Sequence, residues 1–159
     1  MQRPLLPLWD FGWVDYESMT LAGVHTPSDA PSAYVGSPAF GTSFVGPQRD
    51  DFSDAHGPFR RGAVSASDFV ALTPSEFRRR VSEIRRPDGF AEPASDEQWA
   101  PVDALVADIS TRCIALYVLR LTERDHDRFH DWGHVLTIFR EFICVEPDLS
   151  VTRLVFGYD

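Results

Sequence analysis

The fold is decided by residues 138–159, which read IFREFICVEPDLSVTRLVFGYD. Two apolar segments, Ile138–Val145 and Val151–Gly157, flank a turn of glutamate, proline and aspartate. Proline and aspartate are typical of tight turns, and β-branched and aromatic residues are typical of strands. The spacing therefore predicts an antiparallel hairpin over these two segments.

A third strand and one helix are predicted before this hairpin. The short apolar run Cys113–Leu119 is typical of a strand buried inside a sheet. Thr73 and Glu76 have the spacing of a capping box, with a proline at the first helical position between them. A helix is therefore expected to begin after Thr73 and to end at Pro87.

A second helix is expected between Asp96 and Ser110, where apolar residues recur at helical spacing. Pro101 offers an alternative first position for that helix. Residues 130–139 fit either a helix or a strand. Together these elements predict an α+β fold, in which an antiparallel sheet from the C-terminal half packs against two helices.

The N-terminal part has a different composition. Glycine, proline and serine occupy 17 of the 47 positions from Glu17 to Ala63, and no helical period is visible there. Short strands are expected only at Ala33–Gly36 and Thr42–Gly46. The segment nevertheless carries evenly spread large aromatics, which predict a chain pinned to its own domain or to a partner subunit. These aromatics are Tyr34, Phe40, Phe44, Phe52 and Phe59.

A single domain over residues 1–159 is expected, with an irregular, aromatic-pinned segment at 1–63 wrapping the α+β core at 64–159. The chain has 159 residues and a net charge of -9, and no apolar run approaches the roughly 18 residues of a membrane span. An acidic chain binds nucleic acid poorly, so neither nucleic acid nor a membrane is an expected partner. No secretory signal is recognisable, which favours a cytoplasmic protein with reduced thiols.

All 15 basic residues are arginines, and asparagine is also missing. Codon usage in a GC-rich genome explains both absences, so an arginine alone is no sign of a binding site. Their distribution is more informative, because residues 74–87 carry a net +3 and the remainder carries -12. The candidate partner-binding residues are Arg78, Arg79, Arg85 and Arg86, which would dock on an acidic protein surface or on a second copy of this chain. The alternatives are a solvated face with internal pairs, such as Arg79 with Glu83, or a phosphate site.

Three histidines, His126, His130 and His134, are spaced by four residues. Histidines at this spacing on one helix can share a metal ion, which makes a Zn-like site a candidate. Gly133 disfavours such a helix, and a solvated connection between strands is the alternative. His56 could supply a distant ligand. Otherwise no cofactor is expected.

No phosphate-binding loop, nucleophile elbow or zinc-protease motif is present in the sequence. The composition therefore favours a non-enzymatic binding or assembly protein, either an acidic inhibitor of the immunity type or a subunit of a larger assembly. The alternative is a small metal-dependent or histidine-based enzyme that uses His126, His130 or His134.

Overall fold

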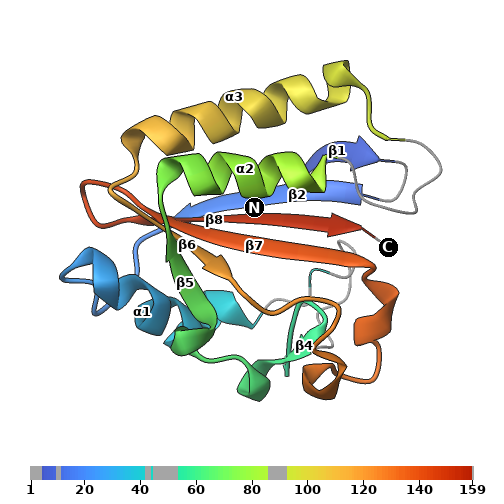
Figure 1. The fold of residues 1–159 in the computed structure, drawn as a ribbon. Helices are drawn as coiled ribbons and strands as arrows, with labels where there is room; N and C mark the ends of the chain where they lie inside the picture. The colour runs from blue at the N-terminus through green and yellow to red at the C-terminus, as the bar shows by residue number, and fades with distance from the viewer. Residues whose placement is uncertain (1–4, 10–11, 42–43, 45–53, 86–92, 159) are drawn as a thin grey trace.

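The computed structural model describes residues 5–9, 12–41, 44, 54–85 and 93–158 (Figure 1). Its centre is a six-stranded sheet in the order β1-β2-β8-β7-β6-β5, and every pairing is antiparallel. The predicted α+β fold is confirmed. The strands are β1 (Leu5–Trp9), β2 (Gly12–Met19), β5 (Phe69–Leu72), β6 (Ala115–Leu119), β7 (Ile138–Val145) and β8 (Val151–Tyr158).

Two helices, α2 (Pro74–Ile84) and α3 (Asp96–Arg112), run side by side over one face of the sheet (Figure 1). Each begins at a capping box, in which the N-cap residue is Thr73 for α2 and Ser95 for α3. Both predicted helices are confirmed. Pro101 lies inside α3 and is not its first residue, because the Ser95 cap starts the helix earlier.

The C-terminal hairpin has the predicted form. Strands β7 and β8 pair along their whole length, from Ile138 opposite Tyr158 to Val145 opposite Val151. Strand β6 begins later than expected, at Ala115. Cys113 lies outside that strand and caps α3, since its N–H donates to the Ile109 carbonyl at 3.1 Å.

The N-terminal part contributes more regular structure than its composition predicted. Strands β1 and β2 extend the sheet beyond β8. The strand expected at Ala33–Gly36 is wrong, because these residues belong to the helix α1 (Ala30–Gly36), which follows a 3-10 turn at Pro27–Asp29. Of the strand expected at 42–46, only Phe44 lies within the described residues.

The sheet is buried on both faces. On one face, Phe77, Trp99 and Ile109 from the helices pack against Phe142 and Phe156 from the sheet. This double burial explains why β7 and β8 read as nearly continuous apolar runs.

The second core lies on the opposite face of the sheet. There α1 and the small hairpin of β3 (Ala55–His56) and β4 (Phe59–Arg60) cover it. This core contains Tyr34, Phe40, Phe44 and Phe59, and Phe52 lies outside the described residues.

Residues 130–139 form neither one helix nor one strand. A 3-10 turn at Gly133–Val135 precedes β7. A Cβ atom at Gly133 would lie 2.2 Å from the Pro58 carbonyl oxygen, so only glycine fits this close approach. In the part of the chain that the structure describes, no helix is both long and apolar enough to cross a bilayer.

Candidate functional site

The outward surface of α2 and α3 carries the arginines that the sequence singled out. Arg78, Arg79 and Arg80 are all exposed on α2. Arg79 forms an ion pair with Glu83 one turn later, as predicted. Arg86 lies outside the described residues.

Arg85 connects the two helices. Its guanidinium donates to the carboxylates of Asp96, at 2.7 Å, and Asp103, at 3.0 Å. The same group lies 5.3 Å from the centre of the Trp99 ring, within cation–π range. The hydrogen bonds that Arg85 donates to both carboxylates raise the pKa of Arg85. Arg85 is therefore already engaged within the chain.

The positive charge of α2 is offset by its neighbour. Helix α3 carries four carboxylates, which are Asp96, Glu97, Asp103 and Asp108. Among the described residues, Arg78 and Arg80 make no ion pair. These two guanidiniums are the cations that the helical surface offers to a partner.

A groove of about 200 Å³ lies between α2 and α3. Its floor is formed by Val81, Trp99 and Val106, which are almost fully buried in the core beneath the helices, and Arg78 and Asp103 add charged groups. The groove is smaller than the roughly 300–1,000 Å³ of typical small-molecule sites. The charged groups around it, and not its buried floor, are what this surface presents to a protein partner.

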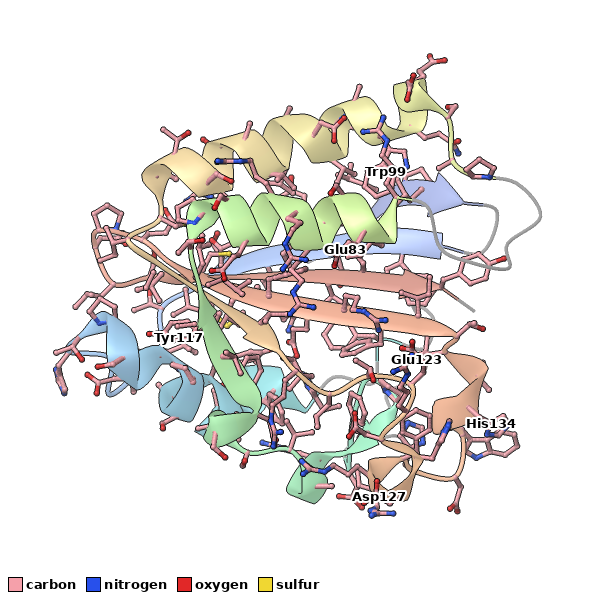
Figure 2. The ribbon with its side chains drawn as sticks, in the orientation of Figure 1. Glu83, Trp99, Tyr117, Glu123, Asp127 and His134 are labelled. Carbon is pink, nitrogen blue, oxygen red and sulfur yellow. The ribbon has the colours of Figure 1, made fainter. Side chains whose placement is uncertain are left out.

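The three clustered histidines do not share one helix face. His126 and His134 are exposed and belong to separate 3-10 turns. Figure 2 shows His134 and Asp127 at the opposite end of the molecule from Glu83 and Trp99. Among the described residues, no three or more histidine, cysteine, aspartate or glutamate side chains are grouped so that they could hold a metal ion.

His130 is held by two hydrogen bonds. Its Nε2 atom lies 3.0 Å from the Gly57 carbonyl oxygen, and its Nδ1 atom accepts from the Trp132 N–H at 3.1 Å. A ring nitrogen beside a carbonyl must carry the proton, so His130 is a neutral imidazole with both nitrogens engaged. Glu123, which precedes His126 by three residues, forms an ion pair with Arg140.

A larger cleft, of about 940 Å³, borders this stretch. Its lining includes His130, Asp131 and Asp54 together with Arg60 and Arg61. Both arginines donate to backbone carbonyls, and neither forms an ion pair among the described residues. The cleft therefore presents charges of both signs to solvent.

A buried polar network lies on the α1 side of the sheet and contains His56, which the sequence predicted only as a distant metal ligand. Glu141 on β7 accepts from the Tyr34 hydroxyl at 2.6 Å and contacts His56 Nε2 at 2.6 Å. The other His56 nitrogen, Nδ1, lies 2.6 Å from the Phe40 carbonyl oxygen. The Phe40 carbonyl can only accept, so His56 Nδ1 donates to it, and the hydrogen bond between Nε2 and the Glu141 carboxyl group engages the second ring nitrogen. Burial, together with the Glu141 charge, raises the pKa of Tyr34 well above its usual value.

Arg153 on β8 completes this network. It is fully buried and donates to Glu17 at 2.9 Å and to the Ala39 carbonyl at 3.2 Å. Its guanidinium also lies 4.7 Å from the centre of the Phe44 ring. Burial opposes its charge, but nearby acidic groups, including Asp15, keep the pKa of Arg153 raised. The network therefore fastens the N-terminal segment to the sheet and is closed to a substrate.

Comparisons of the chain with protein-family models, with curated protein sequences and with solved structures found no match. The choice between the candidate sites therefore depends on the contacts, burial and charges of their residues.

Proposed function

We propose that this protein is a non-enzymatic binding or assembly protein of the cytoplasm, and that an acidic protein partner docks on its α2–α3 surface. One observation carries the proposal. Arg78 and Arg80 are exposed on α2 and make no ion pair among the described residues, and Arg78 lines the groove whose apolar part is formed by Val81, Trp99 and Val106. Arginine side chains are enriched in protein interfaces and among the residues that contribute most to binding.

The net charge of -9 does not prevent this association. Exposed charges are screened beyond about 8 Å at physiological ionic strength, so the repulsion between two acidic proteins is weak at a distance. At contact, an acidic side chain of the partner meets the guanidiniums of Arg78 and Arg80 directly. Arginine can then bind a carboxylate through two parallel hydrogen bonds.

The test is affinity purification from the source cells with the wild-type chain, the double variant R78E/R80E and the control variant R124E. Arg124 is also exposed and makes no ion pair among the described residues, but it lies outside the helical layer. We expect wild type and R124E to retain an acidic partner that R78E/R80E loses. A second copy of the chain as partner would appear as a dimer of the purified protein in light scattering.

A histidine-based or metal-dependent enzyme is the second candidate, and the cleft beside His130 favours it. This cleft is large enough for a small substrate and also contains Asp131, Arg60 and Arg61. Elemental analysis of untagged protein and the shift of its melting temperature on adding zinc test the metal-dependent form. A turnover assay of His130→Ala tests the histidine-based form.

A further inference from the structure

The two cysteines of the chain meet where α3 ends beside the sheet. Cys113 caps α3, and the next residue, Ile114, donates its N–H to the Val145 carbonyl at 2.8 Å. Cys144 precedes Val145 on β7 and faces the helix side of the sheet, in the same core against which Cys113 packs. The Ile114–Val145 hydrogen bond therefore brings the two cysteines together at this end of the core.

The two thiols differ in access to solvent. Cys144 is completely buried, whereas Cys113 is partly exposed. The hydrogen bond from Cys144 lowers the pKa of Cys113 against the effect of burial, and the positive charge of Arg112 acts in the same direction. The Cys113 contact and burial raise the pKa of Cys144 well above its usual range. Only one thiol of the pair is therefore both accessible and inclined to ionise, as an oxidant-sensitive thiol requires.

We propose that Cys113 and Cys144 are an oxidant-responsive dithiol, in which hydrogen peroxide attacks Cys113 and Cys144 then closes an intramolecular disulfide. In the first step the Cys113 thiolate attacks one peroxide oxygen. The O–O bond breaks, and the departing hydroxide takes a proton to become water, which leaves a sulfenic acid on Cys113. In the second step Cys144 gives up its proton and its sulfur attacks the Cys113 sulfur. The S–O bond breaks and a second water leaves, so two thiols and one peroxide give one disulfide and two waters.

The disulfide would join the end of the helical layer to the centre of the sheet. It closes a loop that contains β6, the histidine stretch and most of β7. A crosslink between residues so far apart in sequence restricts the unfolded chain strongly. Oxidation should therefore raise the melting temperature by about 5–15 °C. This proposal does not depend on the docking surface of α2 and α3.

The test treats the purified native chain with hydrogen peroxide and measures its intact mass without reductant. We expect the wild-type monomer to lose about 2 Da, and dithiothreitol to restore both the mass and the melting temperature. The matched variants separate the two thiols. Cys144→Ser should stop at the sulfenic acid, which dimedone traps on Cys113, and Cys113→Ser should give no adduct because Cys144 is buried.

Two results would overturn the proposal. One is a wild-type monomer that keeps its full mass at peroxide concentrations that oxidise a model thiol completely. The other is a dimedone adduct on Cys144 in the folded Cys113→Ser variant. Circular dichroism of each variant before oxidation shows whether it is folded, and labelling of native wild type with iodoacetamide, expected only at Cys113, tests the same asymmetry without a substitution.

Discussion

At the scale of single residues, the buried pair of His56 and Glu141 has a large expected effect on stability. Replacing Glu141 with leucine leaves the His56 ring and the Tyr34 hydroxyl without their hydrogen-bond partner. We expect Glu141→Leu to lower the free energy of unfolding by about 3–5 kcal/mol. Glu141→Gln keeps an acceptor for Tyr34 and a polar group beside His56, so its cost should be only about 1–2 kcal/mol. Urea unfolding measures both, and equal losses would contradict the pairing.

The lowered pKa of Asp68 indicates how the free energy of unfolding should change with pH. Burial would raise its pKa, but hydrogen bonds from Ser65 and the charges of Arg120 and Arg128 hold it below the usual value. A carboxylate with a lowered pKa stabilises the fold above the unfolded pKa, and this contribution is lost as the pH falls through the folded pKa.

Wild type should therefore lose stability below about pH 4 more steeply than Asp68→Asn. Urea unfolding between pH 2.5 and 7 tests this difference. If the two proteins lose stability in parallel, Asp68 does not contribute in this way.

At the scale of elements, the sequence predicted the helices and strands that are marked by residues close to them in the chain. The capping box at Thr73 fixes the start of α2, and the turn at residues 146–148 fixes the hairpin of β7 and β8. Strand β2 could not be found in this way, because its inward-facing Asp15 looks like a surface residue. Arg153, far along the chain, pairs with Asp15 and offsets the cost of burying that carboxylate.

Helix α1 and the buried network could not be predicted from neighbouring residues either. Helix α1 has seven residues, too few for a visible period, and Gly36 ends it. Glu141 and Arg153 are charged residues inside largely apolar strands, and such residues are a sequence signal of a buried partner. The identity of the partner of Glu141, His56, depends on how distant segments pack.

Pro101 supplies a prediction about α3. It is exposed inside the helix and cannot donate the hydrogen bond that an alanine would supply. We expect Pro101→Ala to raise the free energy of unfolding by about 1–3 kcal/mol. Pro93→Ala, at an exposed position before the helix, serves as the control and should give no such gain. An unchanged or lowered stability of Pro101→Ala would show that the proline is accommodated without cost.

At the scale of the whole molecule, the excess positive charge of residues 74–87 is partly offset by ion pairs with carboxylates of the same chain. Two carboxylates of α3, Asp96 and Asp103, pair with Arg85 at the end of α2, and Asp108 pairs with Arg112 within α3. The surface that remains for a partner is narrower than the sequence predicted, because Arg79 and Arg85 already have carboxylate partners. Arg78 and Arg80 are left as its cations.

The docking surface is tested by the dissociation constant of the co-purified partner, measured by calorimetry for wild type, R78E/R80E and R124E. We expect R78E/R80E to weaken binding at least tenfold and R124E to stay within twofold of wild type. Added salt should also weaken the wild-type complex. Binding of R78E/R80E with wild-type affinity would contradict the proposed docking surface.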